Sequence, residues 1–107
     1  MSDYNSKALI ALRPDLKIKI KMKPLLMDML QPPAGGFMNP AEEQSVRNAE
    51  DPMGKLIDIL LGKGDKEFKT FCDMLEKSNH RAWAISLREK AEWYRAKNQT
   101  DGKQYGL

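Results

Sequence analysis

Residues 53–77 read MGKLIDILLGKGDKEFKTFCDMLEK and contain two apolar patterns on either side of a Gly-Lys-Gly turn. The first pattern consists of Met53, Leu56, Ile57, Leu60 and Leu61, and the second of Phe68, Phe71, Cys72 and Leu75. Spacings of three and four residues are typical of one buried helix face. Two helices this short cannot bury their apolar faces alone, so we predict that the other segments of the chain cover them.

The turn between these helices carries its own local signals. Gly62 and Gly64 can adopt the left-handed backbone that ends a helix, and the Asp65 carboxylate can cap the next one. These signals predict a short helical hairpin over residues 53–77.

The remaining segments also predict helices. Pro14 interrupts a first element over about residues 2–22, and Pro24 begins a second over residues 24–31. Asn39 and Pro40 begin a third, which ends near residue 49, and Asp51 with Pro52 begins the fourth. A last helix follows a cap at Ser78 or Asn79 and contains Trp83, Leu87, Ala91 and Tyr94 at helical spacing. We therefore expect an all-α fold, a six-helix antiparallel bundle over residues 1–97, with a flexible tail over residues 98–107.

The segment LKIKIKMK, residues 16–23, gives conflicting signals. Its strict alternation is typical of a strand, because Leu16 and Ile20 would face away from Ile18 and Met22 in a helix. A lone strand would leave its backbone groups unpaired, however, so we predict a helix here.

The central hairpin resembles the fourth and fifth helices of caspase recruitment domains (CARDs). The resemblance rests on Leu56, Ile57, Asp58, Ile59 and Leu60, then Lys63 and Gly64, then Phe68 and Phe71. It covers roughly residues 6–92 and implies a death fold with a bent first helix. The join at residues 48–53 is about one turn shorter than is usual in that family.

Composition indicates one domain in a reducing compartment. The 107 residues are 41% hydrophobic and 31% charged, with a net charge of +3, and no apolar run reaches the length of a bilayer. The single cysteine, Cys72, excludes an internal disulfide, and we expect a cytoplasmic protein without a membrane segment.

The chain offers little for catalysis. Cys72 and His80 are the only candidates for a nucleophile and its base, and Cys72 shares the apolar face of Phe68 and Leu75. One cysteine and one histidine do not make a metal site, and the Gly-Lys-Gly turn is not a phosphate-binding loop. We expect a non-enzymatic protein with no cofactor and no small-molecule substrate.

Charge, in contrast, is segregated along the sequence. The first helix is basic, whereas the second and third helices are acidic. The CARD resemblance implies that a basic surface of the first and fourth helices pairs with an acidic surface of the second and third in another such domain. On the basic side we expect Arg13, Lys17, Lys21 and Lys55, and on the acidic side Asp28, Glu42, Glu43 and Glu50.

The predicted function is therefore pairing with another CARD-containing protein, a caspase, adaptor or sensor, or with further copies of this chain. Such pairing would assemble an apoptotic or innate-immune signalling complex. Two alternatives remain at this stage: a pyrin or death-effector domain of the same architecture, and a nucleic-acid patch at residues 17–23. The patch lacks interleaved aromatic residues, and the chain carries 15 acidic ones, so we expect no nucleic-acid binding.

Overall fold

Six α-helices make up the part of the chain that the computed structural model describes, namely residues 1–20, 24–30 and 37–105. Side chains are described over the same ranges except residues 24–25 and 98–105, and no strand occurs in them. The helices are α1 (Asp3–Lys19), α2 (Pro24–Asp28), α3 (Pro40–Asn48), α4 (Pro52–Leu61), α5 (Asp65–Lys77) and α6 (Arg81–Tyr105). The prediction of an all-helical fold is confirmed for these residues.

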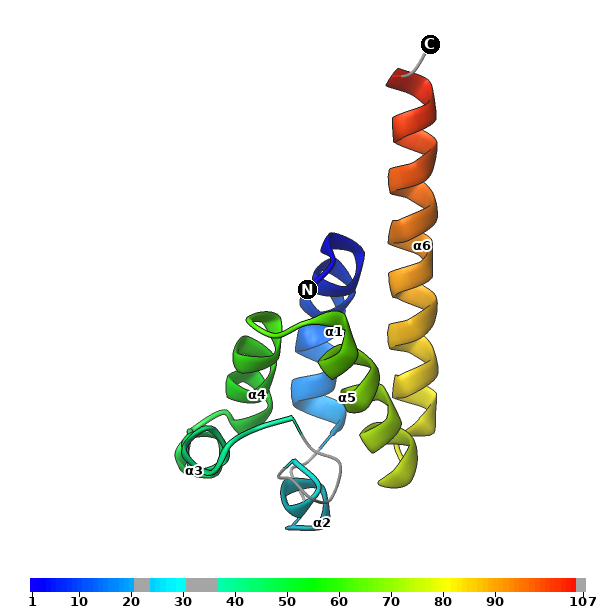
Figure 1. Cartoon of the computed structure of the whole chain (residues 1–107). Helices are drawn as coiled ribbons and strands as arrows, with labels where there is room; N and C mark the ends of the chain where they lie inside the picture. Colours follow the sequence, from blue (N-terminus) through cyan, green and yellow to red (C-terminus); the bar gives the residue numbers. More distant parts are fainter. Residues whose placement is uncertain (21–23, 31–36, 106–107) are drawn as a thin grey trace.

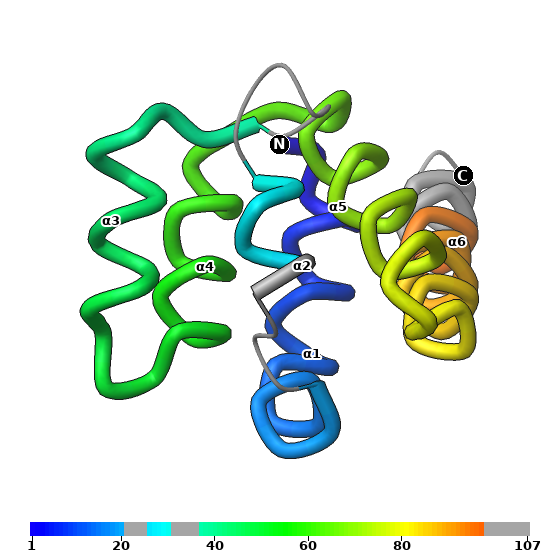
Figure 2. Tube along the Cα trace, turned by 90° about the horizontal axis from the view of Figure 1, so that it is seen from below, coloured from blue at the N-terminus to red at the C-terminus, as the bar shows by residue number. Residues whose placement is uncertain are grey.

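The helices are arranged around α1. One side of α1 packs against α4 and the other against α6, while α5 packs on α6 (Figure 1). The view from below shows α4 between α1 and α3 (Figure 2). The basic first helix and the acidic third helix are consequently held apart by the width of α4.

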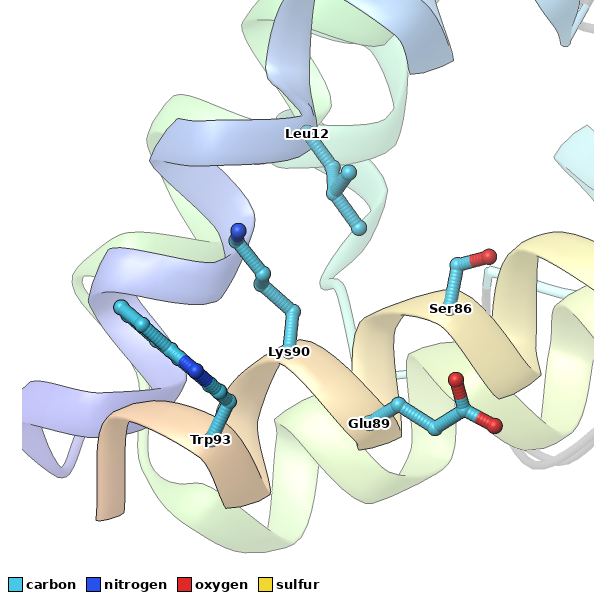
Figure 3. Close-up of a pocket in the computed structure, with 5 residues that line it drawn as sticks. All are labelled: Leu12, Ser86, Glu89, Lys90 and Trp93. Atoms are coloured by element: carbon cyan, nitrogen blue, oxygen red, sulfur yellow. The ribbon is translucent and has the colours of Figure 1, made fainter. Parts of the chain in front are cut away.

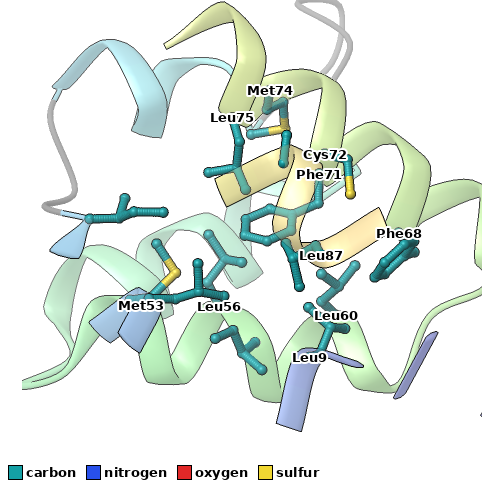
Figure 4. Packing of buried hydrophobic residues seen from close by; sticks show 14 of the residues in the cluster. Leu9, Met53, Leu56, Leu60, Phe68, Phe71, Cys72, Met74, Leu75 and Leu87 are labelled. Atoms are coloured by element: carbon teal, nitrogen blue, oxygen red, sulfur yellow. The ribbon is translucent and has the colours of Figure 1, made fainter. Parts of the chain in front are cut away.

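The core is built from the two halves of the central stretch. Leu56 and Leu60 of α4 and Phe71 and Leu75 of α5 are completely buried, and Leu9 of α1 is as well (Figure 4). Phe71 lies at the centre of this cluster, and its ring meets Phe37 edge to face at 6.5 Å between centroids. The expectation that other segments cover the hairpin is confirmed.

The first helix continues through its proline. Pro14 lies inside α1 rather than at the start of a second piece, although it cannot donate the backbone hydrogen bond that other residues supply. The helical prediction for the alternating segment is confirmed as far as Lys19. Ile20 is extended, and residues 21–23 lie outside the described ranges.

Helical geometry also explains the alternation. Leu16 and Ile20, four residues apart, are both buried, whereas Ile18 on the opposite side of α1 is 71% exposed. The apolar residues of this segment therefore serve two different faces of the helix.

Two predicted helix starts are confirmed in detail. The Asn39 side chain accepts from the Glu42 backbone N–H at 2.8 Å, and the Glu42 carboxylate accepts from the Asn39 N–H at 3.1 Å, which makes a capping box. Asp51 caps α4 by accepting from the Gly54 N–H at 3.1 Å.

The predicted backbone at the central turn was wrong. Gly62 and Gly64 have φ angles of −85° and −100°, so neither is left-handed. Asn79, just after α5, is left-handed instead, with a φ of 66°. The next N–H, that of His80, donates to the Leu75 carbonyl at 2.7 Å, which is the bond that closes a helix end of this kind. Asn79 thus ends α5 instead of capping α6.

Asp65 also has a different role from the predicted cap. It is the first residue of α5, and its carboxylate accepts from the Ser2 N–H at 2.7 Å, from the Ser2 hydroxyl and from the Asn5 side-chain amide at 2.9 Å. These donors, the Ser2 hydroxyl first, hold the pKa of the Asp65 carboxyl below its ordinary value. Asp65 therefore anchors the beginning of α1 to the beginning of α5.

Replacing Asp65 by asparagine is expected to lower the free energy of unfolding at pH 7 by about 1–2 kcal/mol, because ionised acceptors make the stronger hydrogen bonds. A carboxyl with a lowered folded-state pKa stabilises the protein above its unfolded pKa, and this contribution is lost as the pH falls through the lowered value. Urea unfolding from pH 7 to pH 2 should show the two proteins converging in acid. Asp3→Asn is the control, since the one ion pair that Asp3 forms among the described side chains is with Lys7 on the surface. An equal loss in both variants would contradict the anchor.

The last helix is longer than predicted. Its backbone is helical to Tyr105, and its C-terminal half extends past the other helices (Figure 1). This extension accounts for principal extents of 51 × 25 × 24 Å. The sequence predicted a flexible tail from residue 98. A helical backbone does not exclude mobility, because helix ends fray, so the flexibility of this segment stays a prediction.

Candidate protein-interaction surfaces

The residues predicted for the basic side gather where the second half of α1 meets the start of α4. The Arg13 guanidinium lies 2.8 Å from the Asp58 carboxylate and 3.4 Å from the Gly54 carbonyl oxygen. The Lys17 ammonium lies 2.7 Å from the Asp51 carboxylate. We call the surface formed by Arg13, Lys17 and Lys55 the basic face.

Two carboxylates partly neutralise the basic face. Lys17 is the main cause of the lowered pKa of the Asp51 carboxyl, and the Gly54 N–H adds to it. Lys55, by contrast, is exposed and forms no ion pair with any side chain that the structure describes. Lys21 lies outside the described residues.

An apolar residue stands within the basic face. Ile18 is 71% exposed and, with Arg13, Pro14 and Lys17, lines a hollow of about 270 Å³. Protein interfaces combine an apolar centre with a charged rim, and this arrangement matches that composition.

Gly54 leaves room for the Asp51 and Arg13 side chains of the basic face because it has no side chain of its own. A Cβ at this position would lie 2.1 Å from the Asp51 carboxylate oxygen and 3.3 Å from the Arg13 guanidinium. The Asp51 side chain has to move if that space is filled, and both the helix cap and the pair with Lys17 depend on its position.

We expect Gly54→Ala to release the Asp51 carboxylate, so that its pKa rises toward the ordinary value. The lost cap costs about 1 kcal/mol, and the better helix propensity of alanine offsets a similar amount, so stability should change little. NMR titration of the Asp51 carboxyl carbon measures the shift. Gly62→Ala is the matched control, because its Cβ would meet only the Ile59 carbonyl oxygen at 3.5 Å. An unchanged Asp51 titration in Gly54→Ala would contradict the expectation.

Two cationic side chains, Arg47 on α3 and Lys63 just after α4, form ion pairs with the predicted acidic residues. Arg47 lies 3.0 Å from the Asp28 carboxylate and also pairs with the Glu43 carboxylate. Glu43 is chiefly responsible for a raised pKa of the Arg47 guanidinium. Asp28 and Glu43, fifteen positions apart in sequence, are thus brought to one place by a shared partner.

The exposure of these carboxylates differs. The Asp28 side chain is 73% exposed, whereas Glu43 is only 4% exposed, so Glu43 fixes Arg47 rather than presenting its own carboxylate to a partner. Glu42 caps α3 and pairs with Lys63 at 2.9 Å, which lowers the pKa of its carboxyl. The accessible acidic group of α2 is therefore Asp28, and we call the surface around Asp28, Glu42 and Arg47 the acidic face.

Glu50, also predicted for the acidic side, lies between α3 and α4, next in sequence to the Asp51 that binds Lys17, and its side chain is exposed. It forms no ion pair within the described part of the chain.

Four partners of the predicted residues were missed in the sequence. Arg47 was detectable, because it follows Glu43 by four residues on one helix. Asp51, Asp58 and Lys63 reach their partners across the fold, and no local spacing signals those contacts.

Cys72, the one cysteine of the sequence, lies in the hydrophobic core. Burial raises the pKa of the Cys72 thiol to about 12, and the side chain is 1% exposed, so it is a protonated part of the core. No three His, Cys, Asp or Glu side chains among the described residues form a potential metal site. Likewise, none of the described helices combines the length and the hydropathy needed to cross a bilayer.

The comparisons with known proteins add no relative. No family model, no curated protein and no solved structure matches the chain.

Proposed function

We propose that this chain is a non-enzymatic interaction module of the CARD type, with a death fold, that pairs with other domains of its kind, its own copies included. Pairing would assemble an apoptotic or innate-immune signalling complex in the cytoplasm and bring a protease or an adaptor to its partner. The resemblance of residues 56–71 to the fourth and fifth CARD helices supports the family, and the six helices agree with it.

One observation carries the proposed mechanism. The basic face on α1 and α4 and the acidic face on α2 and α3 are different surfaces, since α4 lies between α1 and α3 (Figure 2). When two complementary patches lie on different faces, copies associate head to tail, and the chain of contacts need not close. Open oligomers or filaments are the expected product.

The internal ion pairs of the basic face are compatible with this use. Arg13 and Lys17 keep 34% and 40% of their side-chain surface exposed, and pairs at such exposure stabilise a fold by at most about 1 kcal/mol. A partner carboxylate can replace Asp51 or Asp58 at little cost. The exposed ammonium of Lys55 offers an additional contact.

The carboxylates Asp51 and Asp58 also weigh against nucleic-acid binding at α1. Phosphate groups approaching Arg13 or Lys17 would meet these negative charges at the same place. A single protein carboxylate carries less negative charge than a run of phosphates, so it meets that repulsion less strongly.

Sedimentation velocity and electron microscopy over a concentration series, at low and at high salt, test the proposal. We expect species larger than a dimer at low salt, which dissociate as salt screens the charged faces. A protein that stays monomeric at every concentration and salt level would contradict pairing between its own copies through these faces.

A further inference from the structure

The exposed side of α6 takes no part in the charged faces. Trp93 is 53% exposed there, an unusual position for the largest apolar side chain. Ser86, Glu89 and Lys97 follow the same side of the helix at spacings of three and four residues around it. We call Ser86, Glu89, Trp93 and Lys97 the α6 strip.

A hollow of about 330 Å³ adjoins Trp93. Leu12 of α1 and Ser86, Glu89 and Lys90 of α6 line it together with the indole (Figure 3). Leu12 points toward α6 from the neighbouring helix, so the floor of the hollow is partly apolar. The α6 strip thus combines a projecting aromatic ring with a partly apolar hollow beside it. A contact between identical surfaces needs a surface that complements itself.

The charges of the strip are placed symmetrically about the ring. Glu89 precedes Trp93 by four residues, and Lys97 follows it by four. Neither forms an ion pair with a described side chain, and the Lys97 ammonium lies 5.1 Å from the centre of the Trp93 ring. Both charges are therefore available to an outside partner.

We propose that two copies of this chain pair through the α6 strip, with the two α6 helices antiparallel about a two-fold axis near Trp93. In that arrangement Glu89 of each copy faces Lys97 of the other, and the two Trp93 rings meet at the axis, each at the edge of the other copy's hollow. Parallel helices would place like charges together.

A second copy fits this strip better than an acidic ligand does. Lys90 and Lys97 flank the indole, each 5.1 Å from the ring centre, and would attract carboxylates. Glu89 lines the same hollow, however, and would repel them. A partner complements the strip when it sets a positive charge opposite Glu89 and a negative charge opposite Lys97. The antiparallel copy carries its charges in that order.

The α6 contact is closed and separate from the head-to-tail contact, so the two can be measured apart. Asp28→Lys, which disables the acidic face, provides the background in which only the α6 dimer should remain. Sedimentation equilibrium of this variant is expected to show a monomer–dimer equilibrium. Trp93→Ala added to it should weaken the dimer by about tenfold or more.

Charge reversal provides the decisive comparison within that background. Glu89→Lys and Lys97→Glu should each weaken the dimer about tenfold or more, whereas their equimolar mixture should dimerise as well as the parent. The mixture recovers because two lysines of one strip then face two glutamates of the other. Arg95→Glu, two residues from Trp93 and so on the opposite side of the helix, is the matched control and should leave the dimer intact.

Three results would overturn the α6 dimer: a monomeric Asp28→Lys parent, a dimer that ignores both reversals, or a mixture that does not recover. Each differs from failure of the proposed function. If the head-to-tail contact is absent, Asp28→Lys and the unaltered protein sediment alike, whatever α6 does.

Discussion

Asp28→Lys is expected to abolish head-to-tail association while the domain stays folded. The Asp28 carboxylate is the most exposed group of the acidic face, and its replacement sets a lysine beside Arg47 where a basic partner surface must approach. Like charges brought together in an interface cost several kcal/mol, so the dissociation constant of this contact should rise at least about 100-fold. Sedimentation velocity at low salt would then show no species larger than a dimer.

The fold should tolerate this change because Arg47 keeps its second partner. Glu43 is buried against Arg47 and holds the guanidinium without help from Asp28. Asp28→Asn is the matched control, since it removes the charge without reversing it, and it should weaken association less. Association that persists in Asp28→Lys, or a loss of helical circular dichroism, would contradict the role assigned to this residue.

Phe71→Ala is expected to have the largest effect on stability. The ring is completely buried among residues of α1, α4 and α6 and also meets Phe37, so its removal leaves a cavity on several sides (Figure 4). Phenylalanine-to-alanine changes in such positions cost about 3–5 kcal/mol. A domain of this size has a free energy of unfolding of only about 5–15 kcal/mol in total. The variant should therefore lose a large part of its stability and unfold at a clearly lower temperature and urea concentration.

Urea or thermal unfolding followed by circular dichroism measures this loss. Phe71→Leu should lose less, because leucine fills most of the space, and it keeps the comparison measurable if the alanine variant does not fold. Ile18→Ala is the surface control, since Ile18 is 71% exposed, and it should change stability by less than about 0.5 kcal/mol. Equal losses at Phe71 and Ile18 would contradict the described core.

Local signals in the sequence predicted most of the helices. Asn39 and Asp51 cap the helices that follow them, because capping depends on residues only three positions away. The apolar spacing in residues 53–77 identified the centre of the core for the same reason. Even the alternating segment was predicted correctly as far as Lys19, since an isolated strand has nothing to pair with.

Contacts between distant segments were not predictable in this way. Asp65 looks like a cap in sequence, but Ser2, sixty-three residues earlier, occupies its carboxylate. The predicted acidic residue Glu43 is buried, and the predicted basic residues Arg13 and Lys17 carry carboxylate partners from α4 and its cap. Formal charge along a sequence therefore overstates the charge that a folded surface presents.

The most direct test of the central claim mixes two variants, each with one disabled face. Asp28→Lys keeps the basic face, and Lys55→Glu keeps the acidic face. Lys55 is chosen because it forms no ion pair with a side chain in the described ranges. Pairing through α6 contributes equally to every mixture, because neither substitution touches the α6 strip. Association between fluorescently labelled copies is compared for the mixture and for each variant alone.

The account predicts that the mixture associates more tightly than either variant alone and that high salt removes the difference. Equal association in the mixture and in both separate variants would contradict pairing between a basic and an acidic face.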